Sequence, residues 1–399
     1  MKPLEGIRVL ELGQLMAGPF AGTLLAYFGA EVIKVEPPGR GDAVRGWRTL
    51  DETGTAVWWY TLGRNKKCVT VDLKSAEGRQ LVRRLVDKVD VLIENFRPGT
   101  LERWDLGPDE LESTNPGLVI SRISGYGQDG PKASLPGYAS VCEGVGGLRY
   151  VNGFPGQPPV RPNLSLGDSL AALHAAFGIV MALFHRDRGS EPGNKGQIVD
   201  TAIYEAVFNM MEAVVPEYDR CGEVRGPSGS TITGIVPTNT YPCKDDRWVI
   251  IGGNGDSIYR RLMKVAGRSD LADDPRLARN AGRVEHQEEI DGAIAKWTAD
   301  LTVEQVLAAL EEARVPAGPI YNVADMLEDP HFQARGLFEE VEAGGKPLKI
   351  PAILPKLSET PGATEWAGPP LGSHNSEILG GLLGLSDREL DELREKGVV

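Results

Sequence analysis

The sequence has few cysteines, and their spacing excludes the sites that cysteines usually build. The 399 residues include only four, at Cys68, Cys142, Cys221 and Cys243, which match neither a disulfide framework nor zinc-ligand spacing. The five histidines show no metal-ligand spacing either, so we expect no bound metal. Scattered thiols of this kind are typical of a reducing compartment, and we expect a cytoplasmic protein.

Long apolar runs and an excess of positive charge are also missing. No apolar run reaches the ~18 residues that a membrane span needs, and the N-terminal MKPLEGIRVLELGQL mixes charged with apolar residues, unlike a signal peptide. We therefore expect no membrane contact. The chain has 43 Lys and Arg against 56 Asp and Glu, a net charge of −13, which argues against nucleic acid as a partner. Neither a P-loop nor a G-x-S-x-G motif occurs.

Strand and helix patterns alternate through the first 150 residues. Strands are predicted over 7–12, 31–36, 68–73, 89–94 and 118–123, with helices over 20–29 and 75–88. This alternation predicts an α/β fold with a parallel sheet covered by helices. The loops that follow successive strands, GQLMAGP, EPPGRGD, ENFRPG and SGYGQDG, should meet at one sheet edge, where such folds bind ligands. SGYGQDG contains G-x-G-x-x-G, but prolines follow it instead of a helix, so a dinucleotide site is rejected.

The later part of the chain predicts a smaller α/β unit. A polar segment rich in Gly, Ser and Thr occupies 219–240, and from Tyr241 onward a strand, a turn and a helix follow. Further helices are expected near 284–299 and 302–314. Capping boxes begin the helix at 302 and the last helix, which starts at Ser386. The length of the chain suggests two or three domains.

Between these parts lies an apolar helix, predicted within 161–188. Its large apolar residues recur at helical spacing and predict one buried face: Leu166, Leu170, Leu173, Phe177, Val180 and Phe184. Asp168 lies at the beginning of this helix, where the macrodipole favours an ionised carboxylate. Residues of this type in this place usually cap the helix. The alternative is an exposed nucleophile on a rigid helix, approached over Gly167.

Basic residues gather in the loops at the predicted strand ends. As a group they would suit a phosphorylated ligand, and Phe96 offers an aromatic face for a base or an acyl chain. The basic residues are Arg45, Arg48, Arg64, Lys66, Lys67, Lys74, Arg97 and Arg103.

Four stretches together resemble a known family. GIRVLELGQLMAGPFAGTLLAYFGAEVIKVEPPGRGD, GRNKKCVTVDLK, VDVLIENFRPG and LGDSLAALHAAFGIVMAL are similar, in order and spacing, to class III (CaiB/BaiF) CoA-transferases. The tail motifs VPAGPI, DPHFQARG and PLGSHNSEIL extend the resemblance over the whole chain.

The resemblance implies an interlocked homodimer in which each chain threads through a ring made by the other. Each chain would have a large Rossmann-like CoA-binding domain over 1–200, completed by 330–399, and a small α/β domain over 225–325. The segments 201–224 and 326–335 would be linkers.

By the same resemblance Asp168 is the nucleophile. Its carboxylate would attack an acyl-CoA thioester to give an anhydride, then an aspartyl-CoA thioester, which an acceptor carboxylate would reverse. The residues expected to contact coenzyme A are Met16, Ala17, Val71, Lys74, Asn95, Phe96, Arg97, Arg103 and Tyr138. No metal or nucleotide is required, since coenzyme A enters as a co-substrate.

Three positions depart from the formyl-CoA branch of the family. Met16 replaces Gln, Pro136 replaces Lys, and Ala139 replaces Glu, so formate and oxalate are not favoured. The region 226–242 resembles members that use succinyl-CoA and a C4–C6 dicarboxylate such as malate or citramalate. Arg161 and the segment 228–233 are the candidates to hold the second carboxylate.

Three other functions stay open. One is a formyl-CoA:oxalate-type transferase. An acyl-CoA racemase or epimerase of the same superfamily would pair the Asp with a His, and the loop GYAS at 137–140, where that His is expected, has none. A non-catalytic CoA-binding subunit of a heteromeric transferase should lack the aspartate, which this chain retains.

Overall fold

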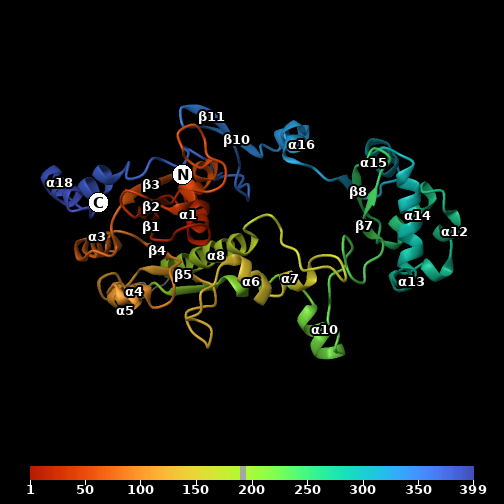
Figure 1. Ribbon diagram of the computed structural model, residues 1–399, viewed down its shortest axis with the longest axis horizontal. Helices are drawn as coiled ribbons and strands as arrows, with labels where there is room; N and C mark the ends of the chain where they lie inside the picture. The colour runs from red at the N-terminus through yellow and green to blue at the C-terminus, as the bar shows by residue number, and fades with distance from the viewer. Residues whose placement is uncertain (189–194) are drawn as a thin grey trace. The chain divides into compact units, whose positions relative to one another are not determined.

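The computed structural model describes residues 1–188 and 195–399, which form two compact units (Figure 1). The first unit comprises Met1–Leu148, Pro162–Glu212 and Gln333–Val399, and the second comprises Arg149–Arg161 and Ala213–Phe332. The first unit therefore contains both the beginning and the end of the described chain.

A six-stranded sheet forms the centre of the first unit. Its order is β3–β2–β1–β4–β5–β6, and every neighbouring pair is parallel. The strands are β1 (Arg8–Glu11), β2 (Glu31–Glu36), β3 (Lys66–Thr70), β4 (Val91–Glu94), β5 (Val119–Ser124) and β6 (Ile198–Ala202). The predicted α/β class with a parallel sheet is confirmed. The strand order reverses between β1 and β4, and in doubly wound folds ligands bind at such a switch point.

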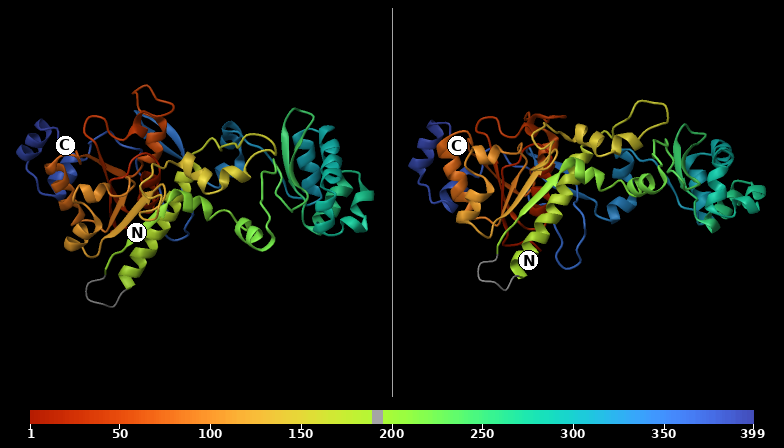
Figure 2. Two further views of the ribbon diagram at one scale, coloured as in Figure 1. Left: turned by 60° about the horizontal axis from the view of Figure 1, so that its bottom comes forward. Right: turned by 90° about the horizontal axis from the view of Figure 1, so that it is seen from below.

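Helices cover both faces of this sheet (Figure 2). Each face has its own apolar core. One core joins β1, β2 and β4 to α1 (Ala17–Tyr27) and α8 (Leu166–Arg188). The other joins the opposite side chains of these strands to α3 (Ala76–Val86) and α18 (Asp387–Glu395). Val9 and Leu10, neighbours in β1, are both buried but lie in different cores. Because both faces are covered, the strands read as continuous apolar runs.

The packing of α8 differs from the sequence interpretation. Its small residues, Ala171, Ala172, Ala175 and Ala176, lie in the core. Four of the six large apolar residues expected to be buried are exposed instead, with exposed fractions of 49% for Leu173, 64% for Phe177, 41% for Val180 and 61% for Phe184. Leu166 and Leu170 are partly buried, and Leu170 packs against the core. For the four exposed residues the prediction was wrong, because helical spacing identifies an apolar stripe but not the surface that covers it.

The length and composition of α8 also bear on the expectation of no membrane contact. Among the described helices it alone is long and apolar enough to cross a membrane, judged by length and composition only. Core helices pass the same test, and 44% of its apolar stretch is buried in the structure.

The C-terminal segment completes the first unit along the edge strand β3. The backbone N–H of His374 donates to the carbonyl of Cys68 at 3.0 Å, and Asn375 Oδ1 accepts from the N–H of Thr70 at 2.8 Å. These bonds satisfy backbone groups that an edge strand would otherwise expose. The strand begins at Lys66, two residues before the predicted start, and ends earlier. A lysine in a buried strand gives no hydropathy signal, so the predicted bounds were wrong.

The second unit contains a three-stranded antiparallel sheet in the order β7–β8–β9. Its strands are β7 (Thr238–Pro242), β8 (Trp248–Gly252) and β9 (Ala317–Pro319), and its core joins them to α11 (Asp256–Val265), α14 (Gln287–Ala299) and α15 (Val303–Glu312). The predicted capping boxes are present at Thr302 with Gln305 and, in the first unit, at Ser386 with Glu389. The helix expected over 284–299 is interrupted at His286.

The remaining elements are short. They are a 3-10 turn at Ala43–Gly46, α2 (Val57–Leu62), α4 (Thr100–Arg103), α5 (Pro108–Thr114), α6 (Ala139–Val145), α7 (Leu148–Val151), α9 (Ile203–Phe208), α10 (Val214–Cys221), α12 (Ser269–Ala272), a 3-10 turn at Pro275–Leu277, α13 (Asn280–Glu285), α16 (Val323–Glu328), α17 (Pro330–Ala334), β10 (Phe338–Ala343), β11 (Lys346–Pro351) and a π-helix at Ser376–Leu382.

Candidate functional site

Two strand-end loops are joined at the switch point of the sheet. Asn95 follows β4, and its Oδ1 accepts from the N–H of Gln14 at 2.8 Å while its Nδ2 donates to the carbonyl of Gln14 at 2.8 Å. Gln14 belongs to the loop between β1 and α1. The side chain of Asn95, predicted to contact coenzyme A, therefore fixes the neighbouring loop.

Hydrogen bonds from charged side chains fix the backbone of the loop from Gly13 to Met16. Leu15 has a φ of 66°, which is unusual for a residue other than glycine, and its N–H donates to both carboxylate oxygens of Asp42 at 3.1 Å. Lys34 Nζ donates to the carbonyl of Gly13 at 2.8 Å. Together with Asn95, these contacts fix the position of Met16 and Ala17 at the start of α1.

Four side chains that are completely buried form the base of this loop. Lys34 Nζ lies 3.0 Å from Glu11 Oε1 and 3.0 Å from Asp42 Oδ2, and Lys66 Nζ lies 2.8 Å from Glu11 Oε2. We call Glu11, Lys34, Asp42 and Lys66 the buried cluster. Burial alone would lower the pKa of Lys34, but the charges of Asp42, Glu11 and Glu36 raise it above its ordinary value, so it stays protonated.

The buried cluster corrects one interpretation of the basic residues. Lys66 was grouped with cations for a phosphorylated ligand, but it is enclosed and paired with Glu11. Arg64 is equally buried and donates to the carbonyls of Thr61 and Pro351. Arg45 forms two hydrogen bonds with Glu36. Lys66 and Arg64 are therefore enclosed in the fold and are not available to a ligand, whereas Arg45 is partly buried and paired with Glu36.

A cavity of about 160 Å³ opens at the ends of β2, β3 and β4. Three of the predicted coenzyme A residues, Val71, Lys74 and Phe96, line it. Phe96 packs edge-on against Trp104, with 5.3 Å between the ring centroids. The lining combines apolar and aromatic side chains with the cations Arg40 and Lys74 and the carboxylates of Glu36 and Asp72. Aromatic side chains and cations of this kind are suited to a base and its phosphates.

The same cavity includes residues that the sequence reasoning missed. Gln14, Arg40 and Trp104 also line it. Arg40 lies in the loop EPPGRGD that was expected at this edge, so its position could have been found; Trp104 has no comparable signal. Arg97 and Arg103 are exposed, and neither they nor Met16, Ala17, Asn95 or Tyr138 line the cavity.

Asp168 is the third residue of α8 and is half buried. It therefore lies inside the first turn of the helix and not at the capping position before it. Burial, together with the negative charges of Asp168 and Glu143, raises the pKa of the Cys142 thiol to about 11. The neighbouring thiol is thus protonated at neutral pH and does not compete as a nucleophile.

The remaining site predictions lie in different places. Tyr138 precedes α6 and is 68% exposed, whereas the adjacent Ala139 is buried. Arg161 and the segment 228–233 belong to the second unit. The hydroxyls of Ser228 and Thr231 donate to each other's backbone carbonyls at 2.8 Å. These two hydroxyl protons are therefore already used within the segment.

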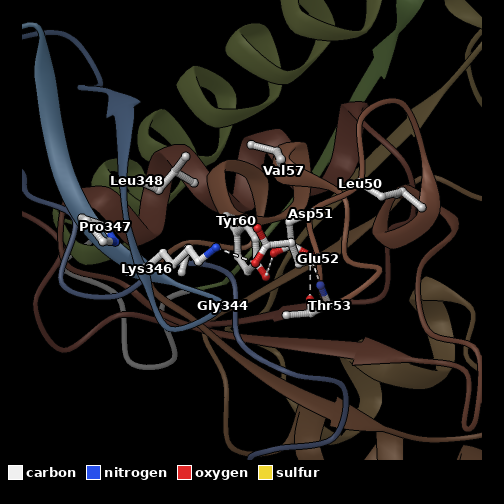
Figure 3. Close-up of a pocket in the computed structure, with 11 residues that line it drawn as sticks. Leu50, Asp51, Glu52, Thr53, Val57, Tyr60, Gly344, Lys346, Pro347 and Leu348 are labelled. Atoms are coloured by element: carbon white, nitrogen blue, oxygen red, sulfur yellow. Dashed lines mark hydrogen bonds and ion pairs between the residues drawn. The ribbon is translucent and has the colours of Figure 1, made fainter.

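A second cavity, of about 500 Å³, contains none of the predicted site residues (Figure 3). Tyr60 donates to Asp51 Oδ2 at 2.7 Å, and Lys346 pairs with Glu52. Hydrogen bonds from Thr53 and Tyr60 lower the pKa of Asp51 to about 2. Because its polar groups pair with one another, this cavity gives no indication of a ligand.

Comparison with known proteins identifies relatives along the whole chain. The model of CoA-transferase family III matches residues 4–375. A succinyl-CoA–D-citramalate CoA-transferase from Chloroflexus aurantiacus is 48% identical over 100% of this chain and 98% of its own length. The alpha subunit of a succinyl-CoA–L-malate CoA-transferase from the same organism is 40% identical over 100% of this chain and 92% of its own length.

Solved structures agree with this assignment. A CaiB/BaiF family protein from Brucella suis superposes with a TM-score of 0.83 at 33% identity, covering 96% of this chain and 99% of that one.

Proposed function

Since the chain belongs to CoA-transferase family III, we propose that it moves coenzyme A from succinyl-CoA to a C4–C6 dicarboxylate. The observation that carries the substrate class is the 48% identity, along the whole chain, to a protein named as a succinyl-CoA–D-citramalate CoA-transferase. Relatives named for L-malate, glutarate and mesaconate share 40%, 35% and 33% identity. The named acceptors in this group are all dicarboxylates.

In the proposed reaction the carboxylate of Asp168 attacks the thioester carbonyl, and the CoA thiolate leaves. The thiolate then attacks the aspartyl carbonyl of the anhydride, which releases succinate and leaves an aspartyl-CoA thioester. The acceptor carboxylate attacks that thioester, which expels the CoA thiolate and forms a second anhydride. The thiolate then attacks the acceptor's carbonyl, which gives the new acyl-CoA and releases the Asp168 carboxylate. Asp168 is ionised at neutral pH without a general base, and water must be excluded because it would hydrolyse the anhydride.

We propose that one part of coenzyme A, its base with the adjoining phosphates, binds at the cavity lined by Val71, Lys74 and Phe96. We propose that Lys74, Arg97 and Arg103 bind its phosphates and that the backbone around Met16 and Ala17 lies against the thioester.

We further propose a cytoplasmic homodimer, interlocked as in the family. The exposed apolar residues of α8, including Phe177 and Phe184, support a second copy as their cover. Because relatives at 40% and 38% identity are named as alpha and beta subunits, a heteromeric enzyme is the second candidate. Activity of the purified single chain would decide between the two.

The function is tested with a panel of carboxylic acids incubated with succinyl-CoA and followed by mass spectrometry of the thioesters. Malate, citramalate, mesaconate or glutarate should accept CoA, and formate and oxalate should be poor. Transfer to formate or oxalate ahead of every C4–C6 dicarboxylate would contradict the substrate proposal. Deuterium uptake at the α-carbon of a chiral acyl-CoA, without carboxylate exchange, would indicate a racemase.

The nucleophile is tested with Asp168→Ala and Asp168→Asn. Turnover should fall by several orders of magnitude, while the protein stays folded and binds CoA. In the wild type, mass spectrometry should find an acyl or CoA adduct on the peptide that contains Asp168. Near-normal turnover in Asp168→Ala would rule this assignment out.

A further inference from the structure

The cap of α8 comes from a different helix. Glu143 belongs to α6 and is completely buried, and its Oε1 accepts from the N–H of Gly167 at 3.2 Å. Gly167 is the second residue of α8, directly before Asp168. The N–H of Ser169 is bonded to the carbonyl of Ser165 at 3.0 Å. A helix leaves its first N–H groups without partners within the helix, and here a carboxylate from α6 accepts one of them.

The contact between Glu143 and Gly167 leaves little space for a side chain at position 167. A Cβ added to Gly167 would lie 3.2 Å from Glu143 Cγ, 3.2 Å from Ile203 Cγ2 and 3.4 Å from Ala139 Cβ. Glu143 lies one helical turn after Ala139, so both face α8. Side chains from α6 and α9 thus enclose the backbone on which the Asp168 side chain is mounted.

Building a carboxylate into this position has a cost. Burying a carboxyl group is unfavourable unless hydrogen bonds and charges compensate, and the Gly167 N–H and the positive end of the α8 macrodipole both contribute to that compensation. Since Glu143 accepts the Gly167 N–H, that N–H does not depend on Asp168 for an acceptor. Helix capping is the ordinary reason for an acid at the start of a helix, and in this chain another residue contributes to it.

We propose that Glu143 is a positioning residue for the Asp168 nucleophile, an inference that rests on the function proposed above. By fixing the first turn of α8, it sets the direction from which the Asp168 carboxylate meets the thioester. Displacement of a reacting group by ~1 Å can cost ~100-fold in rate. Binding of coenzyme A, which takes place at the strand ends, does not depend on this contact.

The test uses variants that change either the length or the charge of the side chain at position 143. Glu143→Gln keeps an oxygen at the same reach, whereas Glu143→Asp keeps the charge but withdraws it by one methylene. Acylation of Asp168 by succinyl-CoA is followed in single turnovers by quenched mass spectrometry. The acylation rate of Glu143→Gln should stay within ~10-fold of the wild-type rate. The acylation rates of Glu143→Asp and Glu143→Ala should be lower by up to ~100-fold. Affinity for CoA should change by less than about twofold, because a positioning role acts on the chemical step.

A matched control removes a cap elsewhere. Ser386→Ala removes the N-cap of α18, and it should leave the acylation rate unchanged. Equal rates in Glu143→Asp and the wild type, or a slower Glu143→Gln than Glu143→Asp, would overturn the positioning role. A wild type that transfers no acyl group to Asp168 would instead overturn the proposed function itself. Glu143→Gln and Glu143→Asp differ least from the wild type in structure. The order of their acylation rates therefore tests the positioning role even if Glu143→Ala does not fold.

Discussion

Replacing Lys34 by methionine should destabilise the first unit strongly. The Lys34 side chain is completely buried, and its Nζ contacts Glu11 Oε1 at 3.0 Å, Asp42 Oδ2 at 3.0 Å and the carbonyl of Gly13 at 2.8 Å. Methionine fills a similar volume but leaves two buried carboxylates with one cation fewer. Breaking a buried ion pair in this way costs about 3–5 kcal/mol.

The effect on thermal unfolding follows from this cost. In a unit of a few hundred residues, 1 kcal/mol shifts the Tm by roughly 2 °C, so Lys34→Met should lower it by about 6–10 °C in differential scanning calorimetry. The N–H of Leu15 depends on Asp42, so the loop before α1 should also loosen. The KM for acyl-CoA should therefore rise.

The matched control is Lys67→Met on the same strand as Lys66. Lys67 pairs with Glu31 at 2.6 Å and Glu377 at 2.7 Å, but its side chain is 24% exposed and that of Glu377 is 53% exposed. Surface pairs of this kind contribute about 0–1 kcal/mol. If Lys34→Met lowers the Tm no more than Lys67→Met, the buried cluster does not support the loop as argued.

Two further predictions concern other charged groups. Alanine at Lys74, Arg97 or Arg103 should raise the KM for acyl-CoA more than it lowers kcat, and CoA affinity should weaken as ionic strength rises; affinity independent of salt would place the phosphate contacts elsewhere. Burial raises the pKa of Glu94 to about 7, although Arg122 opposes the shift. Because this folded-state pKa exceeds the ordinary 4.5, the folded protein favours the protonated Glu94 more than the unfolded chain does. The contribution of Glu94 to folding stability is therefore fully present below about pH 4.5 and is lost as pH rises through about 7, a total of about 3 kcal/mol. The free energy of unfolding in urea should therefore fall between pH 5 and 7 in the wild type more than in Glu94→Gln. If the two proteins show the same dependence of this free energy on pH, the raised pKa of Glu94 is contradicted.

The features that depend on neighbouring residues in the chain could be predicted from the sequence. Apolar runs separated by helical patterns predicted the parallel sheet, since a strand buried on both faces has no polar alternation. The capping boxes at Thr302 and Ser386 were found because the donor and the acceptor lie three residues apart. The cavity residues Val71, Lys74 and Phe96 were reached through resemblance and through their places at strand ends.

The sequence could not show how charges pair across the fold. Lys66 and Lys74 are both lysines in the β3 region, yet one is enclosed beside Glu11 and the other is exposed at a cavity. The residue type alone does not distinguish a lysine in a buried ion pair from a lysine exposed at a cavity. Their difference arises from strands that are distant in sequence and adjacent in the sheet.

For the helix that carries Asp168, the sequence alone determined that a long apolar helix starts near residue 166 and holds an acid in its first turn. The tertiary structure decided which face is buried: the core shared with α1 takes the face that carries Ala172, Ala175 and Ile179, and not the face that carries Phe177 and Phe184. It also decided that Glu143, 24 residues earlier in the chain, accepts the N–H of Gly167. Helical periodicity is a property of one segment, whereas burial and hydrogen-bond partners depend on which segments meet.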